Sequence, residues 1–443
     1  MIDALKKIVR QLLPYSIRRH MHIMSLPTTL KEDFYIGTIQ KRQKKALLNL
    51  KGKEVIKCCF FALNEEVWKY DDVIKIMQTD SRFSPIVLVC PVVNYGYENM
   101  IERMNQCFDY FKKKGYETIL SYDSQENTYI DVRKAISPDI IFYTNPYEGL
   151  IDNRYYIDKF RDILTIYVPY SINNSNAWIS NYDLLFENLL WRHYLPTDKH
   201  KSYAIKYGRN KGVNAVTVGY SGIEELINPN HKIGPNVWKS DNQKLKRIIW
   251  APHHTIQSVG KGSLYYSCFL RYCETMLVLA LKYKDSIQIA FKPHPLLKNK
   301  LELLWGKSKT DDYYQKWETQ ENTCVKEGDY IDLFLTSDAM IHDSGSFISE
   351  YLYVNKPVMR TLNEIDESVK MNDFAMECLA NHYLAHNEVE IEQFIQDVIN
   401  NNDPLKGQRT KFVKEVLLPQ GSPSQNIIDD ILDSIENQIL YRD

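Results

Sequence analysis

Short apolar segments alternate with helical segments along most of this chain, and one polar break divides the alternation into two runs. Strand, helix and strand in succession is the pattern of a mostly parallel, doubly wound sheet, so each run predicts an α/β domain. The break, residues 228–243, holds two prolines, one glycine and many polar side chains, as a linker does. Two such domains leave a cleft at the carboxyl ends of their strands, where open α/β folds bind ligands.

The predicted strands are residues 55–61, 86–93, 139–143, 165–170 and 213–218 before the break, and 247–250, 287–291, 339–341 and 357–359 after it. The longest predicted helices are residues 98–114, 264–283 and 301–317. At 443 residues the chain also exceeds what one hydrophobic core usually organises. We therefore expect four parts: residues 1–24, an N-terminal domain at 25–240, a C-terminal domain at 241–400, and helices at 401–443 that pack back across the domains.

Charge and cysteine usage narrow the class of protein. Lys+Arg number 55 and Asp+Glu 56, and this balance disfavours a general nucleic-acid binder, which usually carries a basic excess. No apolar run approaches the roughly 20 residues of a membrane span. None of the eight cysteines forms a Cys-x-x-Cys pair, so we expect buried thiols in a reducing compartment, which favours a cytoplasmic protein.

Residues 1–24 form a basic amphipathic segment in which apolar side chains recur at helical spacing among lysines and arginines. Such a helix can lie on an anionic membrane surface, which would make the protein peripheral at the inner face of the cell membrane. It can equally pack on the protein's own core with its charges in solvent. Both interpretations stay open at this point.

Two histidine-bearing turns follow predicted strands of the second run. The first is Trp250–Ile256, in which His253 and His254 come directly after a strand that ends near Pro252. The second is Phe291–Leu297, in which prolines on both sides of His294 restrict the backbone and Lys292 adds a positive charge. Histidines at strand ends can donate to a phosphate or transfer a proton. The plain alternatives are a solvated turn and a rigid turn that caps a helix.

A third segment runs from a predicted strand through small polar residues into a helix. Free N–H groups and the helix dipole favour a phosphate or pyrophosphate at such a position, and Gly345 lets a ligand approach the backbone. Glu350 lies one turn into the predicted helix, above Ser346. The plain alternative is an ordinary helix cap. The candidate binding residues of this segment are His342, Asp343, Ser344, Gly345, Ser346, Phe347 and Glu350.

Several established motifs are absent from the sequence. It has no Asp-x-Asp pair, no complete phosphate-binding P-loop, no dinucleotide-binding Gly-x-Gly-x-x-Gly after the first strand, no Gly-x-Ser-x-Gly elbow and no zinc-site spacing. These absences favour an anionic ligand held by amides, hydroxyls, histidines and lysine. We expect no cofactor and no obligatory metal.

Together the segments of the second run resemble the CDP-glycerol glycerophosphotransferase family, which includes teichoic acid polymerases and primases and capsule-locus relatives. Order and spacing agree over about 247–359. The pieces that carry the resemblance are Ala251-Pro252, Lys292-x-His294-Pro295, Ser337-Asp338, Ile341-x-Asp343-x-x-Ser346 with Glu350, and Lys356-Pro357-Val358.

The resemblance implies a GT-B fold, with two Rossmann-like domains facing across a cleft. It implies a transferase that moves glycerol phosphate or ribitol phosphate from a CDP-linked donor to a hydroxyl of a cell-surface glycan or lipid-linked acceptor, releasing CMP. His294 would contact the donor phosphates, Ser346 and the amides around 344–347 would hold the pyrophosphate, and Glu350 would bind a donor hydroxyl. The N-terminal domain would hold the acceptor.

The sequence departs from the family pattern at three places. Lys292 stands where the family prefers arginine, and Ser344-Gly345 replaces a Tyr-Ser pair. The family's catalytic base is a histidine after an N-terminal-domain strand, and residues 167–171 hold no histidine. The base is therefore expected to be His253 or His254, Asp343, or another residue that the sequence does not identify.

Three other functions compete with this interpretation. A GT-B glycosyltransferase that uses a nucleotide sugar in capsule or lipopolysaccharide synthesis would need the same phosphate site. A nucleotide-sugar 2-epimerase would need clustered acidic residues in the cleft. A non-catalytic scaffold has no need of three polar loops at strand ends.

Overall fold

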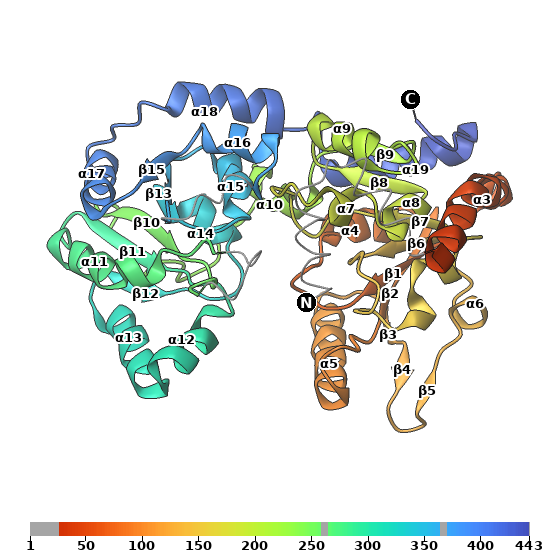
Figure 1. Cartoon of the computed structure of the whole chain (residues 1–443), viewed down its shortest axis with the longest axis horizontal. Helices are drawn as coiled ribbons and strands as arrows, with labels where there is room; N and C mark the ends of the chain where they lie inside the picture. The colour runs from red at the N-terminus through yellow and green to blue at the C-terminus, as the bar shows by residue number, and fades with distance from the viewer. Residues whose placement is uncertain (1–25, 258–264, 364–369, 443) are drawn as a thin grey trace.

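The computed structural model describes residues 26–257, 265–363 and 370–442. Two α/β domains stand side by side, each built on its own parallel sheet (Figure 1). The basic segment at 1–24 lies outside the described residues, so its predicted helix and its membrane contact stay predictions. None of the described helices combines the length and apolar character that crossing a bilayer requires.

The N-terminal domain holds a seven-stranded sheet in the order β3-β2-β1-β6-β7-β8-β9. All its neighbouring strands pair in parallel, and the order reverses beside β1, as in Rossmann-like folds. The strands are β1 Ile56–Ala62, β2 Phe83–Val89, β3 Thr118–Leu120, β6 Ile140–Tyr143, β7 Leu164–Tyr167, β8 Arg192–Leu195 and β9 Ala215–Thr217.

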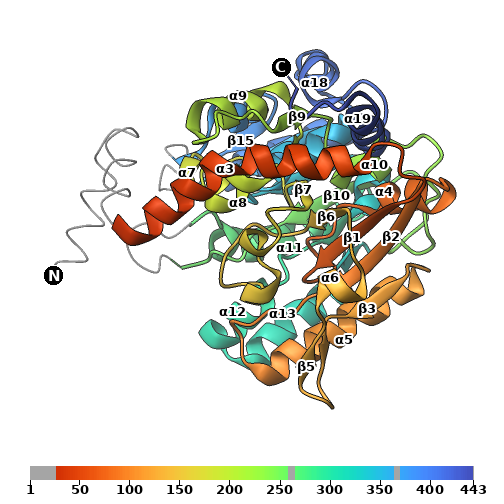
Figure 2. The ribbon, with the colours of Figure 1, turned by 90° about the vertical axis from the view of Figure 1, so that its right-hand side faces the viewer.

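Helices cover both faces of this sheet because its strands are apolar on both sides: β6 and β7 are buried at every position. The long helix α3 lies across the domain, against α8 and near α19 (Figure 2). The main helices of this domain are α3 Leu26–Leu50, α4 Asp71–Thr79, α5 Tyr97–Lys113, α7 Trp178–Tyr182, α8 Leu185–Leu189, α9 Asp198–Tyr207 and α10 Glu224–Ile227.

The C-terminal domain holds a six-stranded parallel sheet in the order β12-β11-β10-β13-β14-β15. Here the order reverses beside β10, so the strand ends of β11, β10 and β13 are neighbours. The strands are β10 Lys246–Ala251, β11 Ile287–Phe291, β12 Thr323–Val325, β13 Ala339–His342, β14 Val358–Thr361 and β15 Tyr383–Ala385.

Nine helices flank this sheet or extend from it in the described part of the chain, and the last of them leaves the domain (Figure 1). Helix α19 packs against α4 and α3 of the N-terminal domain, so the end of the chain returns to the first domain. The exact domain bounds given above stay predictions. The helices are α11 Phe269–Lys282, α12 Leu297–Trp305, α13 Lys307–Thr319, α14 Ile331–Thr336, α15 Phe347–Glu350, α16 Asp373–Leu379, α17 Glu388–Ile399, α18 Lys406–Phe412 and α19 Pro423–Asn437.

Three sequence-based element predictions were wrong in detail. The helix predicted at 301–317 is two helices, because Gly306 adopts φ 84°, a conformation that ends α12 and turns the chain into α13. The helix predicted at 264–283 begins only at Phe269. The strand predicted at 86–93 begins at Phe83 and ends at Val89. Strands of three or four residues, such as β3, β8, β12 and β15, were missed because they are too short to show a period.

Candidate donor site and interdomain cavity

The three polar segments singled out in the sequence meet at one edge of the C-terminal sheet. His253 and His254 follow β10, His294 follows β11, and Asp343 to Ser346 follow β13. These strands are adjacent, and parallel strands end at the same edge, so segments 90 residues apart become neighbours. The register of β10 with β11 and β13 brings the three turns to one level.

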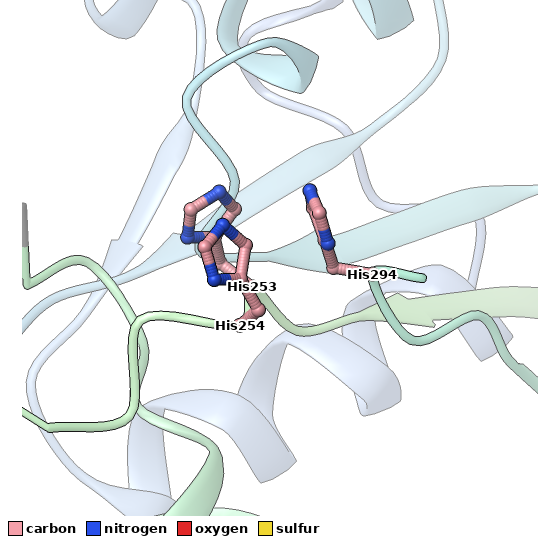
Figure 3. Close-up of side chains that lie close together, drawn as sticks. All are labelled: His253, His254 and His294. Atoms are coloured by element: carbon pink, nitrogen blue, oxygen red, sulfur yellow. The ribbon is translucent and has the colours of Figure 1, made fainter. Parts of the chain in front are cut away.

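The three histidine rings form a compact cluster (Figure 3). Ring centroids lie 4.3 Å apart for His253 and His254, 4.2 Å for His254 and His294, and 4.9 Å for His253 and His294. His253 and His254 come from one loop, and His294 faces them from the next loop. The backbone N–H of His294 donates to the carbonyl of Pro252 over 3.1 Å, which ties the two loops together.

Burial and neighbouring positive charge keep these rings neutral at physiological pH. Burial lowers the pKa of His253 to about 2, with the other two rings, Arg360 and Lys300 acting in the same direction. Burial lowers the pKa of His294 to about 4, and His254, Lys300 and Lys292 act in the same direction. Cationic groups therefore surround rings that are themselves uncharged, a setting that suits an anionic ligand.

The position of one proton bears on what the cluster can bind. The backbone N–H of Leu296 donates to Nδ1 of His294 over 3.1 Å. In a neutral ring the proton then belongs on Nε2, so His294 offers a hydrogen-bond donor. One nitrogen from each ring lies within 4.8 Å of the others, a spacing that a metal ion can share. A metal ligand needs an unprotonated nitrogen, so the hydrogen bond from Leu296 favours a phosphate oxygen over a metal at His294.

Asp343 organises the loops around the histidines. Its carboxylate is buried and accepts the backbone N–H of His253 over 2.5 Å and that of Cys268, just before α11, over 2.6 Å. Burial raises the pKa of Asp343 to about 7, and these two N–H groups act in the opposite direction. Both oxygens are therefore engaged within the protein. Asp343 joins the ends of β13 and β10, and we describe it as a positioning residue.

The segment after Asp343 faces the N-terminal domain. The side-chain amide of Asn174, from the loop after β7, donates to the carbonyl of Gly345 over 2.9 Å and to Ser349 Oγ over 3.0 Å. The carbonyl of Ser344 accepts from Arg360 over 2.9 Å. The predicted helix from Phe347 is shorter than expected, with four α-helical residues followed by a 3₁₀ turn.

Three other predicted site residues have their contacts outside the histidine cluster. Lys292 donates to the carbonyl of Gly328 over 2.8 Å, and burial lowers its pKa to about 8. The ring of His342 is fully buried, 5.4 Å from the ring of His382. Glu350 is buried and accepts from Tyr330 over 2.8 Å. No observation tests the donor-binding role of these residues, which stays a prediction.

A cavity of about 360 Å³ lies between the two domains. Its C-terminal wall includes His253, Gly345 and Ser346, which the sequence had singled out. Its N-terminal wall comes mostly from the ends of β6, β7 and β8 and was largely missed, because tyrosines and a lone glutamate carry no motif. The residues of that wall include Tyr147, Tyr167, Tyr170, Tyr182, Glu187 and His193.

Two Rossmann-like domains that face each other across a ligand-sized cavity define the GT-B architecture, as expected. The wall teichoic acid polymerase TagF has the same fold, with 14% sequence identity, a TM-score of 0.55, and alignment over 93% of this chain and 98% of TagF. The UDP-GlcNAc 2-epimerase from Neisseria meningitidis bound to UDP-GlcNAc aligns over 86% of this chain and its whole length, with 14% identity and a TM-score of 0.57. A putative UDP-N-acetylglucosamine 2-epimerase from Listeria monocytogenes aligns over 88% of this chain and 99% of its own, with 14% identity and a TM-score of 0.54.

The sequence itself supplies the activity class. Residues 241–433 match the family described as CDP-glycerol:poly(glycerophosphate) glycerophosphotransferase. No curated protein matches the chain significantly. The family match confirms the resemblance drawn from the motifs, and it spans all three loops of the candidate donor site. The chain is an enzyme of the CDP-alditol phosphotransferase class, with its glycerophosphotransferase domain in the C-terminal half.

Proposed function

We propose that this enzyme transfers glycerol phosphate or ribitol phosphate from a CDP-linked donor to a hydroxyl of a cell-surface glycan or lipid-linked acceptor. The observation that carries the proposal is the glycerophosphotransferase match over 241–433, a range that contains every loop of the histidine cluster. The acceptor oxygen attacks the β-phosphorus of the donor, the bond from that phosphorus to CMP breaks, and the hydroxyl proton leaves.

Phosphoryl transfer of this kind depends on stabilising the charge that develops on the leaving phosphate. In our proposal the Nε2–H of His294 donates to a phosphate oxygen, and Gly345 and Ser346 contact the pyrophosphate from the cavity wall. The cationic side chains Lys300 and Arg360, which lower the pKa values of the rings, add attraction for the anion. The cluster therefore needs no metal to hold a phosphate, and we propose that none is obligatory.

Donor binding tests this proposal directly. Calorimetry on the wild type and on His294→Ala would use CDP-glycerol, CDP-ribitol, CDP, UDP and UDP-GlcNAc. We expect cytidine-selective binding that weakens in the variant, together with CMP release from CDP-glycerol or CDP-ribitol. Uridine-selective binding would instead support a nucleotide-sugar enzyme, the second candidate, because epimerases of this fold bind UDP-GlcNAc. Binding of neither nucleotide class would refute the donor assignment.

We also propose that residues 2–24 bring the enzyme to an anionic membrane surface, where lipid-linked acceptors reside. The support is the basic amphipathic sequence alone. Co-sedimentation with vesicles containing an anionic phospholipid, compared with neutral vesicles, tests it. Loss of binding on removal of residues 1–24 is the expected result, and equal binding of both proteins would contradict it.

A further inference from the structure

The N-terminal wall of the cavity carries a buried carboxyl group, that of Glu187, with one oxygen that has no hydrogen-bond partner among the described residues. Glu187 belongs to α8, a helix of five residues between α7 and β8. The residue is only 4% exposed and lines the cavity opposite His253, Gly345 and Ser346. Its Oε2 atom is buried without a hydrogen-bond partner.

Glu187 differs in this respect from the other buried acids of the described residues. A carboxyl oxygen that is buried without a hydrogen-bond partner costs free energy, so each such oxygen in a folded protein calls for an explanation. In the described part of the chain, no other buried acidic residue has a buried carboxyl oxygen without a hydrogen-bond partner. The hydrogen-bonded pairs of these other acids are Asp152 with Arg154, Asp183 with Arg209, Glu224 with Ser424, Asp343 with the His253 amide, Glu350 with Tyr330, and Asp430 with Arg192.

The immediate surroundings of Glu187 are aromatic hydroxyls. Tyr147 and Tyr170 contact each other through their hydroxyls over 3.2 Å, and Tyr167 and Tyr182 line the same wall. Tyrosines of this kind bind sugars and alditols through ring faces and hydroxyl groups. The wall therefore suits the hydroxyl groups of a sugar or alditol acceptor.

Titratable groups from several elements interact electrostatically with Glu187. They are Tyr147 and Tyr156 from the segments after β6, Tyr167 from β7 and Tyr182 from α7, and His193 of β8 lines the same cavity. Asp183 raises the pKa of Glu187 and Arg209 lowers it. The Arg209 guanidinium is itself engaged, because it donates to Asp183 over 3.2 Å and to Glu32 over 3.0 Å.

Burial dominates the outcome and raises the pKa of Glu187 to about 8, although the backbone N–H groups of Glu187 and Leu184 act in the opposite direction. A general base works best when its pKa lies near the working pH. His253, the base candidate from the sequence, has a pKa of about 2 in the free protein and is therefore a poor match for that role.

We infer that Glu187 is the general base for the acceptor hydroxyl, and that the tyrosine wall around it is the acceptor site for a sugar or alditol. This inference rests on the proposed phosphotransferase function. The acceptor O–H proton passes to Oε2 of Glu187 as the acceptor oxygen forms its bond to the donor β-phosphorus. The bond to CMP breaks, CMP leaves as the anion next to His294, and Glu187 then releases the proton to solvent.

The test compares Glu187→Gln with Glu225→Gln, a matched control. Glu225 is a half-buried acid of the same domain whose pKa burial also raises, and it does not line the cavity. CMP release from CDP-glycerol would be measured against pH with a short oligo(glycerol phosphate) as the acceptor probe, and donor affinity by calorimetry. For Glu187→Gln we expect kcat to fall by roughly 10²–10⁴-fold with donor affinity unchanged. The rise in kcat through about pH 8 should disappear. The control should match the wild type.

A second variant separates catalysis from folding. Glu187→Asp keeps a carboxylate one methylene shorter, so we expect intermediate kcat with the alkaline rise retained. Wild-type kcat and pH profile in Glu187→Gln would overturn the inference, and so would loss of donor affinity in parallel with kcat. If the wild type releases no CMP from any CDP-linked donor, the proposed function fails and this inference with it. If the wild type turns over the donor and Glu187→Gln does so with the same kcat, only the inference about Glu187 is refuted, and the proposed function stands.

Discussion

The last helix of the chain is attached to the first domain through a buried charged pair, and that attachment can be tested. Arg192 on β8 is fully buried, and its Nε donates to Asp430 of α19 over 2.7 Å. Tyr194 donates to the same carboxylate over 2.8 Å, and Arg442 Nε donates to its other oxygen over 2.6 Å. Asp430→Ala removes all three contacts and leaves a guanidinium without its counter-charge.

The expected loss of stability in Asp430→Ala follows from the burial of Arg192. Removing one partner of a buried ion pair typically costs about 3–5 kcal/mol, and the zero exposure of Arg192 allows no screening by solvent. Its remaining partners, Ser434 Oγ at 2.7 Å and the Leu440 carbonyl at 2.6 Å, satisfy donors but carry no negative charge. We therefore expect the free energy of opening α19 to fall by about 3–5 kcal/mol in Asp430→Ala.

Native-state hydrogen exchange measures this quantity locally, which suits a protein of two domains. The control is Asp429→Ala, which removes an exposed carboxylate next to Asp430 on the same helix. We expect α19 amides to lose protection in Asp430→Ala and to keep it in Asp429→Ala. If the two variants agree within about 1 kcal/mol, the reasoning is refuted, and the apolar face of α19 alone holds the helix. That face consists of Ile427, Ile428, Ile431 and Ile435.

Four further predictions concern the candidate donor site and the cavity. His294→Ala should weaken CDP-glycerol binding by roughly 10–100-fold, the range for a lost hydrogen bond to a charged group. His294→Gln keeps an N–H and should lose less affinity. Equal losses in the two variants would argue against the donor role of His294. Anion binding favours the protonated ring, so wild-type affinity should rise from pH 7 toward pH 5, and a flat profile would contradict this. Exhaustive chelation should leave CMP release unchanged, whereas loss of activity with recovery on Zn²⁺ addition would assign a metal to the histidine cluster. Burial raises the pKa of Glu187 from 4.5 to about 8, so the folded state holds its proton longer than the unfolded state, and stability falls between those values by up to roughly 5 kcal/mol. Denaturant unfolding at several pH values should show this fall in the free energy of unfolding for the wild type and a smaller fall for Glu187→Gln. If the two proteins show the same dependence of stability on pH, this prediction is wrong.

Much of the C-terminal site was predictable because each loop has a recognisable local sequence pattern. Histidines beside prolines at the end of an apolar segment are visible without any partner, as at His294 and His253. The sequence also predicted two α/β domains, since buried parallel strands leave continuous apolar runs. The role of Asp343 was not readable, because its partners, the amides of His253 and Cys268, are 75 residues or more away.

The N-terminal wall could not be predicted in the same way. Glu187 sits in a short apolar stretch and looks like any helical glutamate. Only its burial beneath the cavity, with one oxygen unpartnered, marks it as unusual. The absence of a histidine at 167–171 did point to a different base, but the candidates that the sequence offered were His253, His254 and Asp343, and nothing in it singled out Glu187.

By itself, the sequence determined the α/β class, the two domains, the three polar turns and the family of the C-terminal half, because these depend on local periodicity and short motifs. The tertiary structure decided which turns meet, through the strand order β11-β10-β13, and it decided where the last helix docks. It also decided the pKa values of His294 and Glu187, since burial and neighbouring charge set them and neither exists before the chain is folded.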